Sequence, residues 1–183
     1  MKKYLITSQE FYTNFPDTFQ VKLYEQIKKH NPDYVLYRDK LNQNYNLLAR
    51  VFVDVCSQFD DIKSFIHQDL QLANSLDATG VHLTSNQFDE IVKAKKLGLE
   101  VIISTHTYEE VLKAQNFKAD AVTYSPIFFS PEKGEPKGIE DLNNILSKSD
   151  INIFALGGIV DKSEVKQVKS TSAYGFASIR YFY

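Results

Sequence analysis

The stretch Asn152-Ile-Phe-Ala-Leu-Gly-Gly-Ile159 runs from a short apolar segment directly into two glycines. Earlier in the chain, the apolar run Ala121–Tyr124 leads into Ser125-Pro-Ile-Phe-Phe-Ser-Pro-Glu-Lys133, which opens a long loop ending near Gly138. Helical patterns follow both loops. Backbone N–H groups near a helix N-terminus attract an anion, and paired glycines let it approach the main chain. The two stretches therefore predict strand ends of an α/β fold that bind a small phosphorylated ligand.

Short β-branched or aromatic runs recur along the whole chain. Most are too short and too apolar to be strands with one face in water, which favours a parallel sheet covered by helices. The predicted strands are Tyr4–Thr7, Tyr34–Tyr37, Ser64–His67, Gly80–Leu83, Val101–Ser104, Ala121–Tyr124, Asn152–Leu156 and Tyr174–Ser178.

Helical patterns separate these runs, with apolar residues three or four positions apart. Eight strands that alternate with helices predict a (β/α)₈ TIM barrel, and an open sheet with fewer strands is the alternative. The predicted helices are Phe19–Lys29, Asn46–Phe59, Phe88–Lys96, Tyr108–Asn116, Ile139–Lys148 and a short helix that begins at Asp161 or Ser163 and ends at Val168.

The predicted barrel lacks sequence for one helix after its last strand. Only residues 179–183 follow that run, so the eighth outer helix is expected to be missing or truncated. We expect either the N-terminal segment or a partner subunit to cover the gap. Phe182 and Tyr183 are then expected to be buried there.

Length and composition predict a single domain over residues 1–183, with 43% hydrophobic and 24% charged residues. A net charge of −2 without a basic cluster argues against a nucleic-acid partner and against an anionic membrane surface. No apolar run approaches the roughly 20 residues of a membrane span, so we expect a cytoplasmic protein. Cys56 is the only cysteine, which excludes an internal disulfide and a cysteine-based metal site.

Candidate chemical groups follow the predicted strands, because active groups of such barrels project from the carboxyl ends of the strands. Arg38 and Lys40 flank Asp39 and suit one diphosphate, although a solvated charge cluster has the same spacing. His82 is expected in the core at a strand end, with a catalytic role as the alternative. His106 begins a helix and either caps it or faces the ligand.

The order of these strand ends resembles the thiamine phosphate synthase and TenI-like superfamily over nearly the whole chain. The motifs that carry the resemblance are Tyr4-Leu-Ile-Thr7, Tyr37-Arg38-Asp39-Lys40, Thr79-Gly80-Val81-His82-Leu83, Ser104-Thr105-His106, Ser125-Pro126-Ile127-Phe128 with Ser130 and Lys133, Ala155-Leu156-Gly157-Gly158-Ile159 and Tyr174-Gly175-Phe176-Ala177.

The resemblance implies a (β/α)₈ barrel that is commonly a homodimer and binds a phosphorylated thiazole or thiamine phosphate. In the synthase branch, a pyrimidine diphosphate is joined to a thiazole phosphate with Mg²⁺ on the diphosphate. The TenI-like branch only moves a proton on a thiazole carboxylate phosphate and needs no metal. By this resemblance, the diphosphate would be held by Arg38, Lys40, Ser104, Ser130 and Lys133, and the thiazole phosphate by Gly157, Gly158, Ile179 and Arg180.

The metal ligands of the synthase pattern are missing. Its two acidic positions are occupied here by Gln68 and Gln87, and neutral amides replace poorly the carboxylates that Mg²⁺ prefers. We therefore expect no cofactor, and Mg²⁺ only if synthase activity is retained. Asp69 and Asp89, which lie one and two residues further on, could restore a metal site through a shifted loop.

The tautomerase pattern is also incomplete, because its histidine is replaced by Pro126. A base would then have to be His67, His82 or His106, since histidine titrates near neutral pH. The sequence leaves three hypotheses open: a metal-independent TenI-like enzyme, a divergent Mg²⁺-dependent thiamine phosphate synthase, and a binder of a phosphate ester without catalysis. Glu132 would bring negative charge towards an anionic substrate.

Overall fold

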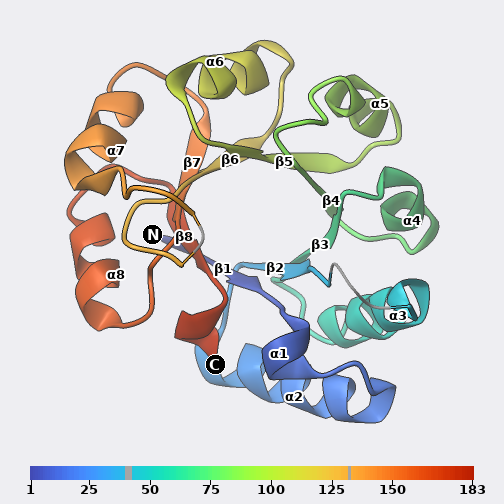
Figure 1. The fold of residues 1–183 in the computed structure, drawn as a ribbon. Helices are drawn as coiled ribbons and strands as arrows, with labels where there is room; N and C mark the ends of the chain where they lie inside the picture. The colour runs from blue at the N-terminus through green and yellow to red at the C-terminus, as the bar shows by residue number, and fades with distance from the viewer. Residues whose placement is uncertain (40–42, 132) are drawn as a thin grey trace.

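The computed structural model describes residues 1–39, 43–131 and 133–183, so the predicted roles of Lys40 and Glu132 lie outside the described residues. Its parallel strands close into one barrel, and helices surround the ring (Figure 1). The strands are β1 (Lys2–Ile6), β2 (Tyr34–Tyr37), β3 (Lys63–His67), β4 (Gly80–Leu83), β5 (Glu100–Thr105), β6 (Ala121–Tyr124), β7 (Asn152–Leu156) and β8 (Gly175–Ser178).

Closure of the sheet excludes the open-sheet alternative. β1 pairs with β2 on one side and with β8 on the other, where Lys2 lies opposite Gly175 and Leu5 opposite Ser178. The predicted (β/α)₈ barrel is therefore confirmed. β2, β4, β6 and β8 are buried along their whole length, as expected for strands enclosed by helices.

The helices alternate with the strands, and two of them were not predicted. α1 and α4 are only four and six residues long, too short for a clear helical period. None of the helices in the described ranges is both long and apolar enough to cross a membrane. The helices are α1 (Gln9–Tyr12), α2 (Pro16–His30), α3 (Tyr45–Cys56), α4 (Leu70–Ser75), α5 (Glu90–Lys96), α6 (Tyr108–Asn116), α7 (Gly138–Leu146) and α8 (Lys162–Lys169).

The interior of the barrel is filled with aromatic rings. Tyr4 and Tyr34 contact each other, and both contact Phe65 and Phe154, with ring centroids 5.1 Å apart for Tyr34 and Phe154 and 5.2 Å apart for Tyr4 and Phe154. Ile6 continues this interior cluster two residues beyond Tyr4 and lines the cavity described below. The barrel is therefore a packed core, and ligand chemistry is confined to the end where the loops follow the strands.

After β8 the chain forms the short 3₁₀ helix η1 (Arg180–Phe182). Phe182 is fully buried, stacked on Phe176 at 5.6 Å and edge-on to His30 at 5.5 Å. Tyr183 is 51% exposed, and its ring contacts Phe11 of α1. The C-terminus lies beside α1 and α2 (Figure 1). The N-terminal helices thus cover this side of the barrel, and burial is confirmed for Phe182 but not for Tyr183.

Candidate functional site

A cavity of about 320 Å³ lies at the carboxyl ends of the strands. Ile6 and Ala177, from β1 and β8, are interior residues of the barrel that also line it. The structure brings most of the predicted site residues together around this cavity: Arg38, His67, Ser104, His106, Ser130, Lys133, Gly157, Gly158, Ile179 and Arg180.

The charged side chains that line the cavity and are described in the structure are all cationic. Arg38, Lys133 and Arg180 line it, and no carboxylate does so among the described residues. None of these three side chains takes part in a salt bridge within residues 1–39, 43–131 and 133–183. Burial lowers the pKa of Arg38, while the nearby Asp39 raises it; a guanidinium still remains protonated at neutral pH. The cavity is therefore suited to an anion.

The two glycines after β7 allow the β6–α7 loop to close over the barrel beside β7 and β8 (Figure 1). Both have positive φ angles, +98° for Gly157 and +69° for Gly158. A β-carbon on Gly157 would lie 2.8 Å from the α-carbon of Pro126. The main-chain N–H groups of Ile127 and Phe128 donate to the carbonyls of Leu156 and Gly157. The glycines are thus required where two loops meet.

Main-chain N–H groups at the ends of β7 and β8 are free to bind a ligand. Gly158, Ile159, Ile179 and Arg180 donate no main-chain hydrogen bond to any group in the described part of the chain. All four residues line the cavity. Successive unpaired N–H groups in a glycine-containing turn form a concave site for an anion.

The N-terminus of α8 does not contribute to this cradle, contrary to the expectation from the glycine pair. The Asp161 carboxylate accepts from the N–H of Ser163 at 2.6 Å, and Glu164 accepts from the N–H of Asp161 at 2.9 Å. Two carboxylates of the chain itself therefore already satisfy this helix end. An anion in the cavity would be bound by the loops alone.

His106 lines the cavity and is a candidate for proton transfer. Thr107, not His106, caps α6. The Nδ1 atom of His106 lies 3.1 Å from the carbonyl oxygen of Ser125, which can only accept a hydrogen bond. Nδ1 then carries the proton in the neutral ring, and the lone pair is on Nε2. No hydrogen bond occupies Nε2 in the described ranges, so it can act as a base in the cavity.

His82 lies below the cavity and does not line it. It is 3% exposed and bonded between Tyr4 and Ser104. Burial lowers its pKa well below the usual value, and electrostatic interactions with His67 and Arg38 add to the effect. A histidine held neutral and away from the ligand is a poor candidate for direct proton transfer.

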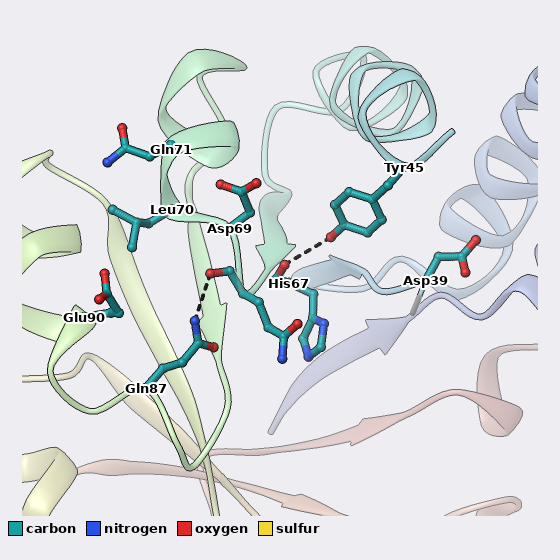
Figure 2. A pocket seen from close by; sticks show the side chains of 9 residues that line it. Asp39, Tyr45, His67, Asp69, Leu70, Gln71, Gln87 and Glu90 are labelled. Atoms are coloured by element: carbon teal, nitrogen blue, oxygen red, sulfur yellow. Dashed lines mark hydrogen bonds between the residues drawn. The ribbon is translucent and has the colours of Figure 1, made fainter. Parts of the chain in front are cut away.

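A second cavity, of about 710 Å³, adjoins the first and shares His67 with it (Figure 2). Asp39, Asp69 and Glu90 line it, without any described lysine or arginine. Figure 2 shows the Gln87 amide reaching across to the neighbouring loop, where its Nε2 donates to the carbonyl of Gln68 at 3.2 Å. The two cavities therefore differ in the sign of their charged groups.

The residues at the family's two acidic positions do not fit Mg²⁺. The Oε1 atom of Gln87 accepts from the N–H of Thr84 at 3.1 Å, while its Nε2 is bound to Gln68. Asp69 accepts from the N–H of Leu72 as the N-cap of α4, and Figure 2 shows its carboxylate turned away from Gln87. Asp89 lines neither cavity. No cluster of three potential metal ligands exists in the described part of the chain.

Four polar residues of the cavity were not among the predicted site residues. Thr84 and Ser85 follow β4 directly, Ser125 precedes Pro126, and Ser178 ends β8. The Ser178 hydroxyl donates to the carbonyl of Ile159 at 2.6 Å and so joins the β7 and β8 ends. Their positions at the end of a strand or directly after one were the only available signal.

The fold and this cavity define a (β/α)₈ barrel with a cationic site at the carboxyl ends of its strands. The family model for thiamine monophosphate synthase matches residues 3–182, and the chain belongs to that family. It is similar to "Putative thiamine-phosphate synthase 2" of Aquifex aeolicus, with 30% identity over 98% of this chain and 96% of that protein.

Two further comparisons agree with this family. The thiamine-phosphate synthase of Persephonella marina is 31% identical over 67% of this chain and 60% of that protein. The solved thiamine phosphate pyrophosphorylase from Pyrococcus furiosus superposes with a TM-score of 0.82 over 97% of this chain and 85% of that chain, at 23% identity. The latter similarity concerns the fold.

Proposed function

We propose that this protein binds a phosphorylated thiazole and acts on it without a metal ion. The observation that carries the proposal is the cavity lined by Arg38, Lys133 and Arg180, with no carboxylate among its described residues. Such a lining favours a phosphate ester, and its described residues offer no carboxylate to a divalent cation. Family membership makes a thiamine precursor the natural ligand class.

The phosphate is proposed to bind at the joined ends of β7 and β8. The free N–H groups of Gly158, Ile159, Ile179 and Arg180 would surround its oxygens. The Arg180 side chain would add a charge-assisted contact. The thiazole ring would then extend towards Ser104 and His106 across the cavity.

The proposed reaction is a proton transfer on a thiazole carboxylate phosphate. His106 Nε2 takes a proton from one position of the ring system, and the same proton is returned at another, so that no group leaves. The hydrogen bond from Nδ1 to the Ser125 carbonyl orients the imidazole. No step requires a diphosphate or Mg²⁺.

The test is an isomerisation assay with purified protein, thiazole carboxylate phosphate and NMR detection. We expect activity that is unchanged by EDTA, and a fall of roughly 10²- to 10⁴-fold in His106→Gln, the usual contribution of a general base. Thiazole phosphate should bind His106→Gln with nearly wild-type affinity. His30→Gln is the matched control, because His30 ends α2 outside the cavity. Full activity of His106→Gln would contradict the proposed base.

A second candidate is thiamine phosphate synthesis, which the names of the similar proteins favour. Arg38 and Lys133, with Ser104 and Ser130, would then face the diphosphate of the pyrimidine substrate. Incubation of the pyrimidine diphosphate and thiazole phosphate with and without Mg²⁺ separates the candidates. Rapid, Mg²⁺-dependent formation of thiamine phosphate would replace the first proposal with this one. Binding without either reaction would leave a non-catalytic phosphate-ester binder.

A further inference from the structure

A chain of two hydrogen bonds connects the interior of the barrel with the cavity. The hydroxyl of Tyr4, on β1, lies 2.8 Å from Nδ1 of His82, on β4. The Nε2 atom of the same imidazole lies 3.0 Å from the hydroxyl of Ser104, on β5. Tyr4 and His82 are buried, whereas Ser104 lines the cavity. A buried tyrosine is thus linked through one histidine to a group that a ligand can contact.

The direction of these two hydrogen bonds depends on which ring nitrogen of His82 carries the proton. Burial keeps the pKa of His82 low, so the imidazole is neutral and carries one N–H group. In one arrangement, Tyr4 donates to Nδ1 and Nε2–H donates to Ser104. In the other, Nδ1–H donates to Tyr4 and Ser104 donates to Nε2.

The surroundings of Tyr4 decide between the two arrangements. Its side chain is packed among Tyr34, Phe65 and Phe154, and its hydroxyl has no partner other than His82 in the described part of the chain. In the second arrangement, the hydroxyl proton of Tyr4 would be buried without an acceptor, which is unfavourable. Burial also raises the pKa of Tyr4, so the proton cannot be given up. Tyr4 must therefore donate.

We propose that Tyr4 and His82 are positioning residues that fix Ser104 as a hydrogen-bond donor into the cavity. Because Nε2–H of His82 already occupies a lone pair of the Ser104 oxygen, the hydroxyl proton of Ser104 is directed to a ligand. The group that Ser104 recognises is then an acceptor, such as a phosphoryl oxygen. A phosphoryl partner rests on the second candidate function, in which Ser104 faces a diphosphate, whereas the direction of the two hydrogen bonds rests on neither candidate.

The ring nitrogens of His82 provide the test, because ¹⁵N chemical shifts distinguish the two neutral tautomers. In the free wild-type protein we expect the Nε2–H tautomer, with the His82 signals assigned from their loss in His82→Gln. Tyr4→Phe removes the only donor to Nδ1 and should give a mixture of tautomers. Tyr34→Phe is the matched control, because Tyr34 belongs to the same aromatic cluster but its hydroxyl is hydrogen-bonded to Tyr174 and not to His82. It should leave the tautomer unchanged.

Ser104→Ala tests whether Tyr4 or Ser104 determines the tautomer of His82. Tyr4 still donates in that variant, so His82 should remain the Nε2–H tautomer although its partner is gone. Binding of inorganic pyrophosphate, measured by calorimetry, should weaken about tenfold or more in Ser104→Ala, as expected for a lost hydrogen bond to an anion. In Tyr4→Phe it should weaken only about twofold, because half of the molecules retain the binding orientation.

The outcomes separate this inference from the proposed function. An Nδ1–H tautomer in the wild-type protein, or a tautomer unaltered by Tyr4→Phe, would overturn the positioning role. The Nε2–H tautomer together with pyrophosphate affinity unaffected by Ser104→Ala would keep the orientation of the chain but remove the phosphoryl group as the partner of Ser104.

Discussion

Gly158 lies so close to the main chain of Phe129 that a β-carbon on this glycine would be 2.4 Å from the Phe129 carbonyl oxygen. The contact joins the end of β7 to the β6–α7 loop, which also carries Ser130 and Lys133. A backbone atom cannot move aside as a flexible side chain can. The position of the loop over the cavity therefore depends on the absence of a side chain at residue 158.

Gly158→Ala is expected to displace the β6–α7 loop. Gly98→Ala is the control, because Gly98 has a φ of +80° and a β-carbon added there would meet no atom within 4 Å. Gly98→Ala should lower the free energy of unfolding by about 1 kcal/mol through backbone strain alone. Gly158→Ala should lower the free energy of unfolding, measured with urea, by more than Gly98→Ala does. It should also weaken phosphate-ester binding. Equal losses in both variants would contradict the role of the loop contact.

Gln87→Glu is expected to separate the loops after β3 and β4 at neutral pH. The new carboxylate could still accept from Thr84, but it would face the Gln68 carbonyl with an oxygen instead of an N–H donor. We expect a loss of about 1–3 kcal/mol in the free energy of unfolding.

The loss in Gln87→Glu should depend on pH in a defined direction. The introduced carboxyl group, when protonated, could donate to Gln68, so the fold raises its pKa above the ordinary glutamate value of about 4.3. The variant should therefore approach wild-type stability below that pH and lose stability as the pH rises through the raised pKa. Gln71→Glu, which alters an exposed residue of the same cavity, should show no such dependence.

Acid should destabilise the protein through the fully buried His82 and, to a lesser extent, the partly buried His30. The fold lowers the pKa of His82 and of His30, in both cases chiefly by burial. Below about pH 6.5 the unfolded chain takes up protons that the native chain does not, so stability falls as the pH drops. His82, which is fully buried, contributes at most about 1.4 kcal/mol per pH unit in that range, and the partly exposed His30 contributes much less. Urea unfolding between pH 7.5 and pH 5 measures how steeply the free energy of unfolding changes with pH. His82→Gln should make this change less steep. An equally steep change in that variant would mean that other groups cause the pH dependence.

The C-terminal aromatic cluster is expected to stabilise the barrel. Phe182→Ala would remove a ring that is fully buried between Phe176 and His30. The expected loss is about 3–5 kcal/mol in the free energy of unfolding. Tyr183→Ala, at a residue that is 51% exposed, is the matched control and should cost clearly less. Similar losses of stability in both variants would mean that burial of the Phe182 ring is not what stabilises the C-terminal segment.

The strands could be predicted because a strand buried on both faces is a short apolar run, and β6 and β7 were found with their observed bounds. The residues around the cavity were then predictable, since all strands of a parallel barrel end on the same side. Contacts between loops were not predictable. The approach of Gly158 to Phe129 and the bridge from Gln87 to Gln68 join segments that are distant in sequence. α4 was missed because six residues contain too little helical period.

His67 stands between two neighbouring openings of opposite charge, with Asp39, Asp69 and Glu90 on one side and Arg38, Lys133 and Arg180 on the other. An anion that diffuses towards the barrel is therefore repelled by one opening and drawn to the other before it makes any contact. Such steering raises the rate of encounter and weakens as dissolved salt screens the charges over about 10 Å. Capture of a phosphorylated ligand should accordingly slow with increasing ionic strength, even where its rate of escape is unaltered.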